Sequence, residues 1–479
     1  MERQLQQARA RRRPRWPRWP GNAGVNEDRA SAGPAGLEAL IDRQNVGAPL
    51  IGLCALGALC MIMDGFDAQV IGFVAPAIVE DWKISPSALA PVFSIGLLGM
   101  VIGSLAISPL ADRHGRRPML ILSVSFFGLC MLATGAVHTM HELLIMRLVT
   151  GVGLGTTVPN VLALVSEFTP ARHRSAAVMI MAACFTVGAA VGGYNAAWMI
   201  PAYGWRSLFA AGGAIPLLIA ALMFFWLPES AKLLALSGAE SARIKNALGK
   251  IYAKAARAAN SNFLSVKSPP SHIPVAELFR DGRFWPTILI WLLNFINLLQ
   301  LYFLSNWLPT LLRSSHLTMK TAVTSGTFLQ VGGLTGALLV ALLTRRIRLI
   351  ILMTVNFFAA AVAIFELGQM IESPAWVLVP IFAAGFCVIG GQPAISAITA
   401  QYYPTLIRSS GVGWSLGIGR IGSIAGPLVG GLFLEMKWGN GRLFLTAAIP
   451  SLIAGFAVLL LARAGVGGAP ADPPRYPSQ

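Results

Sequence analysis

Long apolar runs recur along the whole chain, and they constrain its fold more than any other feature. About 20 apolar residues suffice to cross the hydrocarbon core of a bilayer, and only 12% of the residues are charged, against about a quarter in a soluble domain. The runs are continuous and do not alternate in polarity, so they predict helices and not barrel strands. The sequence therefore predicts an all-α membrane protein with twelve transmembrane helices. The predicted spans are 48–79, 88–110, 119–138, 142–166, 176–200, 206–228, 285–308, 321–343, 349–371, 376–400, 411–435 and 441–463.

One long interior loop, residues 229–284, divides these spans into two groups of six. It is basic and contains the proline-rich stretch SPPSHIP, so we interpret it as a linker with one surface helix. The loops after spans four and ten both read aromatic-x-Pro-x-x-x-Arg-Ser, at 168–175 and 402–409. Six helices duplicated in parallel around a central loop is a transporter architecture. We expect a largely disordered cytoplasmic tail at 1–47, six-helix halves at 48–228 and 285–463, the cytoplasmic loop at 229–284, and a second cytoplasmic tail at 464–479.

The placement of lysine and arginine predicts the orientation and accounts for the net charge of +17. Twenty-nine of these residues fall on the side of the tails and the central loop, and six fall on the other side. An excess of positive charge marks the cytoplasmic side of a membrane protein, so both termini are expected in the cytoplasm. The charge is thereby explained as a topology signal, and it gives no reason to predict nucleic-acid binding.

Residues 1–24 combine arginine, proline and tryptophan and contain no apolar core of a signal peptide, so they are not predicted to be a secretory signal. Two interpretations stay open. In the first, the segment lies on anionic lipid through its arginine and tryptophan side chains. In the second, it is translated upstream sequence, and the native chain starts at Val25.

The sequence gives no support for enzymatic chemistry. Its five cysteines lie singly within apolar runs, without metal-ligand spacing or a disulfide pattern, and are expected to be packing residues. We find no nucleophile and base pair, no phosphate loop and no zinc motif. The stretch GVGLG at 151–155 follows no strand, so it is not a dinucleotide fingerprint. We therefore predict no enzyme, no cofactor and no bound metal.

Two aspartates lie in the middle of the first span, within MIMDGFDAQVIG at 61–72. A charge near mid-bilayer costs about 2.5–3.5 kcal/mol on insertion scales, so such residues usually face a cavity or a partner. Asp64 and Asp67 are spaced i, i+3 and share one helix face. Two like charges so close resist joint ionisation, which suits a pair that loads and releases protons; the alternative is one structural salt bridge. Gly65 between them permits close approach of a helix or a ligand.

Two arginines complete the charges inside the spans. Arg147 lies in span four at about the depth of Asp67, so we expect it to be the partner of the acidic pair; the alternative is a side chain that reaches the membrane interface. Arg420 lies about 15 Å into span eleven, where a guanidinium is a ready fork for a carboxylate. The positions equivalent to these charges in the opposite half carry none. We therefore expect protons to load in the first half and an anionic ligand to bind from the second.

Span seven adds a polar and aromatic stripe, and span ten adds one amide next to a proline. Polar groups among aromatic side chains suit a small amphiphile with a ring, although an asparagine in a bundle more often makes an interhelical hydrogen bond. The stripe consists of Asn294, Asn297, Tyr302, Asn306 and Trp307, and span ten contributes Gln392.

The loop ADRHGRRP at 111–118 resembles the G-x-x-x-D-R-x-G-R-R loop of the major facilitator superfamily. The matching residues are Asp112, Arg113, Gly115, Arg116 and Arg117, and Ser108 stands at the first glycine of the family pattern. In that family the loop is a cytoplasmic latch, so the resemblance implies that Asp112 pairs with nearby helix ends and arginines. The equivalent loop of the second half, LLTRRIRL, lacks the acid.

Within that superfamily the chain is similar to the aromatic acid:proton symporters over about residues 45–463. The similarity is carried by DGFD in span one, RLVTGVGLGTTVPN in span four, YFLSNWLPTLL in span seven and GRIGSIAGP in span eleven. It implies uptake of a benzoate- or hydroxybenzoate-type carboxylate with a proton, across a bacterial inner membrane, by alternating access. We expect the carrier to be a monomer in the bilayer.

An exporter of drugs or metabolites driven by protons is the alternative function. Exporters of this superfamily usually carry G-x-x-x-G-P-x-x-G-G in span five, where this chain reads GAAVGGYN without the proline. The pattern occurs instead in span eleven, at 422–431, which favours uptake over export. A membrane receptor is a third class with less support, because no signalling domain is recognised in the sequence.

Overall fold

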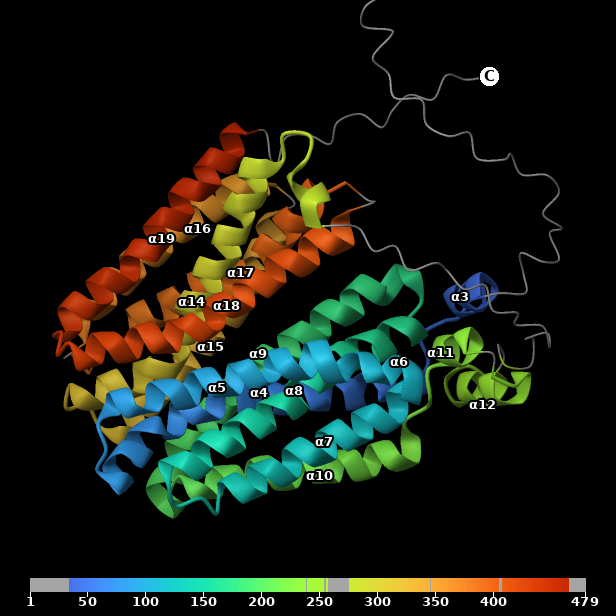
Figure 1. Ribbon diagram of the computed structural model, residues 1–479, viewed down its shortest axis with the longest axis horizontal. Helices are drawn as coiled ribbons and strands as arrows, with labels where there is room; N and C mark the ends of the chain where they lie inside the picture. The colour runs from blue at the N-terminus through green and yellow to red at the C-terminus, as the bar shows by residue number, and fades with distance from the viewer. Residues whose placement is uncertain are drawn as a thin grey trace, which may run out of the picture.

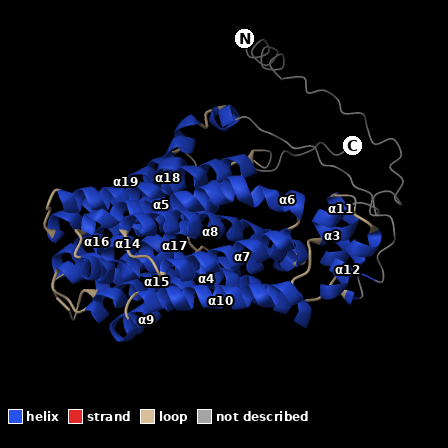
Figure 2. Cartoon of the chain, turned by 60° about the horizontal axis from the view of Figure 1, so that its bottom comes forward, coloured by secondary structure: helices blue, strands red, loops and turns tan. Residues whose placement is uncertain are grey.

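The computed structural model describes residues 34–464 except 238, 254–255, 257–274, 345, 372, 375 and 405–406. This described part is helical and contains no strand, as Figure 2 shows. Twelve of its helices are long and apolar enough to cross a membrane, which confirms the prediction of an all-α protein with twelve spans. Both interpretations of residues 1–24 and the stretch SPPSHIP concern parts of the chain outside the described residues.

The spans are continuous helices, except the second, which changes its helical type along its length. Before the central loop lie α4 (Ala48–Trp82), α5 (Ala90–Ile102), α7 (Arg116–Thr134), α8 (Met140–Phe168), α9 (Ala171–Tyr203) and α10 (Arg206–Trp226). The second span also includes η1 (Pro86–Leu89), the π-helical turn η2 (Gly103–Ile107), η3 (Ser108–Leu110) and α6 (Ala111–His114). After the loop lie α14 (Phe284–Ser314), α15 (Met319–Leu343), α16 (Leu349–Met370), α17 (Leu378–Tyr402), α18 (Arg408–Glu435) and α19 (Asn440–Arg463).

Most of these helices are longer than the predicted spans. The predicted span 285–308, for example, continues to Ser314, because backbone hydrogen bonds carry a helix past the point where its apolar run ends. The third span is the opposite case: it was expected to reach residue 138, but the helix ends at Thr134, just before Gly135.

The two halves repeat the same helix pairs. In the first half α4 packs against α9 and α5 against α8, and in the second half α14 packs against α18 and α15 against α17. Glycines make these contacts close: a Cβ atom at Gly65 of α4 would run into the carbonyl of Phe185 on α9, and one at Gly422 of α18 would run into the carbonyl of Phe295 on α14. Gly65 therefore permits the close approach of a neighbouring helix, which is one of the two roles predicted for it.

The halves meet mainly near one end of the bundle (Figure 1). We call the end that carries α6, α11 and α12 the basic end and the opposite end the far end. Packing between the halves joins α4 to α14, α5 to α18 and α9 to α15. At the far end, Ser94 donates a hydrogen bond to the carbonyl of Ile424 at 2.9 Å, and Glu80 pairs with Arg313 at 2.5 Å. Figure 1 shows the basic ends of the two halves diverging from this contact.

Short helices cover the basic end of the first half: α3 (Pro34–Asp42), α11 (Ala231–Leu236) and α12 (Ser241–Ile251) (Figures 1 and 2). The described part of the N-terminal tail is thus ordered in α3, where Leu37 is fully buried. Glu38 pairs with Lys232 of α11 at 2.6 Å. The described part of the central loop contains two α-helices, α11 and α12, and the short 3-10 helix η4 (Val275–Phe279), where one surface helix was expected. Such short helices form through packing and leave a weak sequence signal.

Tyr252, directly after α12, ties this cover to the transmembrane helices. Its hydroxyl donates to the carbonyl of Phe168 at the end of α8, at 2.7 Å. Burial raises the pKa of Tyr252 to about 12, so the hydroxyl keeps its proton, and this bond, throughout the physiological pH range.

Candidate functional site

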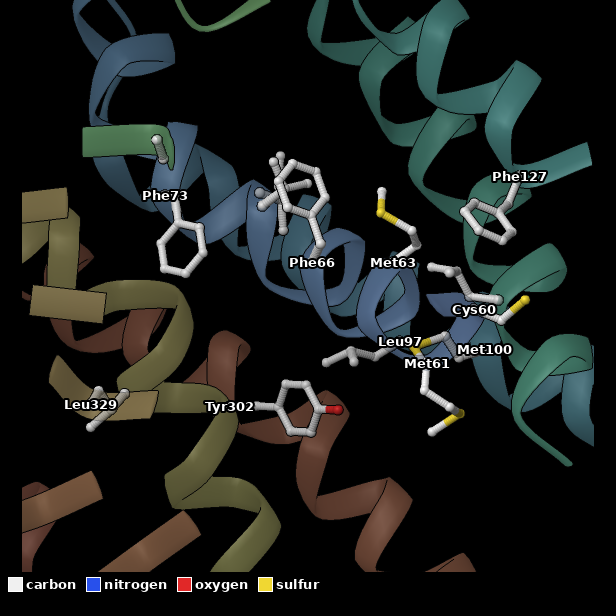
Figure 3. Close-up of a cluster of buried hydrophobic side chains, with 14 of the residues drawn as sticks. Cys60, Met61, Met63, Phe66, Phe73, Leu97, Met100, Phe127, Tyr302 and Leu329 are labelled. Atoms are coloured by element: carbon white, nitrogen blue, oxygen red, sulfur yellow. The ribbon is translucent and has the colours of Figure 1, made fainter. Parts of the chain in front are cut away.

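The acidic pair lies in the middle of α4. This helix has a proline in its first turn, where a missing N–H costs little, and ends at Lys83 in the left-handed conformation. Asp64 and Asp67 are 0% and 2% exposed. Figure 3 shows the apolar surroundings of this segment, which include Cys60, Met61, Met63 and Phe66. A charge on either carboxylate therefore requires a specific partner, because burial removes it from bulk water.

Arg147 of α8 is the partner of Asp67. Helix α8 is capped by Thr139, whose hydroxyl accepts from the Glu142 N–H, and this start places Arg147 two turns inside the helix. Its Nη1 lies 3.5 Å from Asp67 Oδ1, and the two side chains are 5% and 1% exposed. The structure thus brings together the two residues that were predicted to pair, in a setting where water does not screen them.

Two uncharged side chains support the guanidinium of Arg147. The ring of Phe209 on α10 lies 5.2 Å from it in a cation–π contact, and the sulfur of Met131 on α7 lies 3.4 Å from Nη2. Neither role could be predicted from the sequence, because both residues look like ordinary members of an apolar span. Arg147 therefore has favourable contacts that do not depend on the charge of Asp67.

Asp64 faces the second half. It lies within electrostatic reach of Arg420 on α18 and of Asp67, and Tyr302 on α14 interacts with both Arg420 and Asp64. In Figure 3 Tyr302 projects from α14 towards the α4 segment that carries Met61. Among the described residues Arg420 has no ion pair within 4 Å, and neither carboxylate oxygen of Asp64 has a hydrogen-bond partner. A guanidinium and a carboxyl group thus approach each other from opposite halves without being fixed together.

The two asparagines of span seven make interhelical hydrogen bonds. Asn294 donates to the hydroxyl of Ser415 on α18 at 2.7 Å, and Asn297 donates to the carbonyl of Val388 on α17 at 2.9 Å. Their amide oxygens, and that of Gln392, are buried without a hydrogen-bond partner in the described part of the chain. These three oxygens can still accept a hydrogen bond from a ligand.

Trp307 lies in the interface between the halves. It is fully buried, donates from Nε1 to the carbonyl of Pro427 at 2.9 Å, and meets Phe93 of α5 edge to face at 5.1 Å. It lies more than one helical turn beyond Tyr302 on α14, towards the far end. The structure therefore places Trp307 where the halves meet, closer to the far end than Arg420 and Tyr302.

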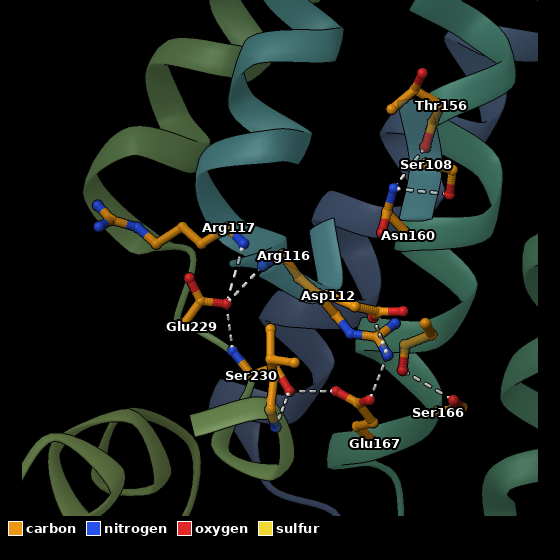
Figure 4. A network of polar contacts seen from close by, with 12 residues as sticks. Ser108, Asp112, Arg116, Arg117, Thr156, Asn160, Ser166, Glu167, Glu229 and Ser230 are labelled. Atoms are coloured by element: carbon orange, nitrogen blue, oxygen red, sulfur yellow. Dashed lines mark hydrogen bonds and ion pairs between the residues drawn. The ribbon is translucent and has the colours of Figure 1, made fainter. Parts of the chain in front are cut away.

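The loop between spans two and three forms a polar network at the basic end (Figure 4). Arg116 reaches Glu167 at 2.9 Å and Asp112 at 3.6 Å. Glu229, just after α10, accepts from the N–H groups of Arg116 and Arg117 at 2.8 and 3.2 Å. These two N–H groups open α7 and have no partner within the helix, so the carboxylate caps it and complements its dipole.

Other members of this loop play smaller parts. Gly115 has φ of 103°, a left-handed value that favours glycine, and the side chain of Asp112 is 66% exposed. Arg113 is exposed. The contacts of this network stay within the first half and its cover. Glu167 and Glu229 were not predicted as members of this network. The signal that could have identified them is an acidic residue at the end of an apolar span, beside a basic loop.

The comparisons with known proteins agree with this architecture. Residues 57–413 match the sequence profile of the Major Facilitator Superfamily. A gallate transporter of Pseudomonas putida is 37% identical over 439 residues, covering 91% of this chain and 97% of that protein. The 4-hydroxybenzoate transporter PcaK of Pseudomonas aeruginosa is 36% identical over 403 residues, covering 84% and 90%.

Solved structures share the fold at low sequence identity. The inward open xylose transporter XylE of E. coli superposes with a TM-score of 0.66 at 17% identity, covering 86% of this chain and 95% of that one. A bacterial homologue of the human lysosomal transporter Spinster, inward-facing, gives 0.67 at 16% identity, covering 89% and 100%. The relatives are transporters and not enzymes, which confirms that prediction. This chain belongs to the Major Facilitator Superfamily and is a multi-pass membrane carrier.

Proposed function

We propose that this carrier takes up aromatic carboxylic acids of the benzoate or hydroxybenzoate type together with protons. The observation that carries the proposal is the position of Arg420. Its guanidinium belongs to a residue about 18 Å from the start of its helix and has no ion pair within 4 Å among the described residues. It also lies within electrostatic reach of Asp64 from the opposite half. A planar fork of this kind binds a carboxylate through two parallel hydrogen bonds.

The relatives support the substrate class. Their names specify gallate and 4-hydroxybenzoate, and another relative, 33% identical, is a 3-(3-hydroxy-phenyl)propionate transporter of Escherichia coli. In our proposal the carboxylate binds Arg420, the ring packs near Tyr302, and ring hydroxyls donate to the free amide oxygens of Asn294, Asn297 or Gln392. Trp307 contributes by closing the far end over the bound acid.

Protons enter the cycle through Asp64 and Asp67. Uptake of a monovalent anion against an inside-negative potential costs about 2.3 kcal/mol per 100 mV, and one accompanying proton cancels that charge. A protonated Asp64 no longer competes with the substrate for Arg420, and a protonated Asp67 releases Arg147 to its uncharged contacts, Phe209 and Met131. The acid and the proton therefore favour each other's binding.

The conformation fits one stage of an alternating-access cycle. The excess of lysine and arginine assigns the basic end to the cytoplasm of a bacterial inner membrane, with both termini on that side. The halves are joined at the far end, so the site would open towards the cytoplasm in this state. Within each half, helices packed through glycine provide two rigid units that rock about the central site. A single chain carries the complete site, so we propose a monomer.

Right-side-out membrane vesicles that contain the protein test this function. With an interior more alkaline than the medium, they should accumulate radiolabelled 4-hydroxybenzoate or benzoate, and a protonophore should abolish the accumulation. Vesicles without the protein are the control. Absence of gradient-driven accumulation for every acid of such a panel would refute the proposal. Accumulation only in inside-out vesicles with an acidic interior would favour the alternative, a proton-driven exporter.

A further inference from the structure

A small cavity lies next to the ion pair of Asp67 and Arg147. Its volume is about 30 Å³, and a cavity needs about 10–15 Å³ on this scale to hold one water molecule. Residues of α4, α5, α8 and α14 form its wall. Three of them are polar, namely Asp67, Arg147 and Asn306; most of the others are apolar, such as Ile71 and Phe93.

The polar atoms at this cavity lack hydrogen-bond partners. In the described part of the chain, neither carboxylate oxygen of Asp67 accepts a hydrogen bond, and Nε of Arg147 donates none. Both side chains are more than nine-tenths buried. The ion-pair distance of 3.5 Å is longer than a good charge-assisted hydrogen bond, which measures about 2.7–2.9 Å. A buried water molecule requires two to four polar partners, and these atoms can supply them.

Asn306 brings the second half of the carrier to this cavity. It belongs to α14, whereas the other described residues of the wall belong to the first half. Its Nδ2 donates to the carbonyl of Tyr302, one turn earlier, at 2.9 Å. That bond orients the amide and leaves its oxygen available as an acceptor. Backbone atoms of Asn306 also lie close to Gly72 of α4, so the residue is fixed where the two halves touch.

The cavity lies on the far side of Asp67. Ile71 is one turn closer to the far end on α4, and Phe93 is in the first turn of α5, which begins at that end. Phe93 also meets Trp307 of α14 edge to face, so an aromatic contact between the two halves lies beside the cavity. When the halves part at the far end, α14 carries Asn306 and Trp307 away from α4 and α5, which opens the cavity to the medium.

We propose that one ordered water binds in this cavity, bridges Asp67, Arg147 and Asn306, and is the last member of the path by which a proton reaches Asp67 from the far side. In the transfer step the water gives a proton to a carboxylate oxygen and takes one from the hydrated proton behind it, so the water is regenerated. Asn306 is a positioning residue: it holds the water but does not bind the transported acid. The inference rests on the proposed proton coupling.

Asn306→Leu is the test variant, because leucine keeps the approximate size and removes the acceptor. Two rates are compared in proteoliposomes: uptake driven by a pH gradient, which requires protonation in every cycle, and counterflow of labelled against unlabelled 4-hydroxybenzoate, which does not. We expect gradient-driven uptake to fall about 10-fold, with counterflow unchanged. This is less than the roughly 100-fold or more that loss of a proton-transfer group costs, because Asp67 itself remains. Asn306→Ser, which keeps an acceptor and leaves room for a second water, should restore much of the loss.

Asn356→Leu is the matched control. Asn356 is also buried, and its amide donates to the carbonyl of Cys387 at 2.7 Å, far from the acidic pair along the chain and in the other half. It should leave the ratio of the two rates unchanged. A similar fall of both rates in Asn306→Leu, or of neither, overturns the inference, as does a high-resolution structure with no water at this position. If the wild-type protein shows no gradient-driven uptake while counterflow proceeds, the proposed proton coupling itself has failed.

Discussion

Removing either member of the buried ion pair should destabilise the carrier, but by unequal amounts. At 3.5 Å and an effective dielectric constant of about 20, the attraction between two unit charges is about 5 kcal/mol. Breaking a buried pair usually costs about 3–5 kcal/mol, because one charge is left without compensation. In Asp67→Asn that charge is Arg147, and a guanidinium cannot lose its proton in a protein.

The opposite variant, Arg147→Leu, leaves Asp67, which can become neutral by binding a proton. We therefore expect Asp67→Asn to lower the free energy of unfolding by about 3 kcal/mol, the low end of the range, because the contacts with Phe209 and Met131 remain. Arg147→Leu should cost about half as much. A loss of 3 kcal/mol corresponds to roughly a 150-fold change in the unfolding equilibrium.

Denaturant unfolding in mixed micelles at neutral pH measures these values for both single variants and for the double variant. The double variant removes both charges, so its loss should be smaller than the sum of the single losses by at least about 1 kcal/mol. All three should lose gradient-driven uptake while they remain in the membrane. Additive losses, or a greater loss in Arg147→Leu than in Asp67→Asn, would refute the reasoning.

Three further predictions follow from other sites. Arg420→Lys should weaken binding of an aromatic acid about 10-fold, since a point charge replaces a fork; titration by intrinsic tryptophan fluorescence measures it, and unchanged affinity would move the carboxylate site elsewhere. Glu229→Ala should lower stability by about 0.5–2 kcal/mol, the usual value of a lost helix cap, whereas Glu240→Ala, whose side chain makes no cap hydrogen bond, should not; equal effects would contradict the capping role. Gly65→Ala should abolish folded protein in size-exclusion chromatography, because its Cβ atom would meet the carbonyl of Phe185, while Gly413→Ala, with open space around it, should behave as wild type; a well-folded Gly65→Ala would show that α4 and α9 can separate.

The transmembrane helices and the charged centre could be predicted from the sequence. An apolar run of sufficient length has few alternatives in lipid, and a charge inside such a run must have a partner, so Asp67 and Arg147 could be matched by depth alone. Phe209 and Met131 could not be found in this way, because nothing distinguishes a residue that contacts a cation from its apolar neighbours.

Contacts between residues that are far apart along the chain also could not be predicted from the sequence. For Asn294 and Asn297 an interhelical hydrogen bond was the more frequent alternative to a ligand contact, but the sequence could not name the partner. Only the structure shows Ser415 and the Val388 carbonyl at their amide groups. Helix α3 was missed because a nine-residue helix depends on the surface it packs against. The loop between spans two and three was found by resemblance, but its carboxylate partner Glu229 comes from the end of a distant span.

The pair of Glu80 and Arg313 has a consequence for the surroundings in which the carrier works. Its side chains are 48% and 37% exposed, so it resembles surface ion pairs, which contribute about 0–1 kcal/mol and weaken as ions accumulate around them. This ion pair joins the two halves only while they are in contact at the far end. More salt at the far end should therefore shift the equilibrium towards carriers that are open at that end, by up to about fivefold. In the orientation that we propose, salinity outside the cell then helps to set how many carriers are ready to bind a substrate.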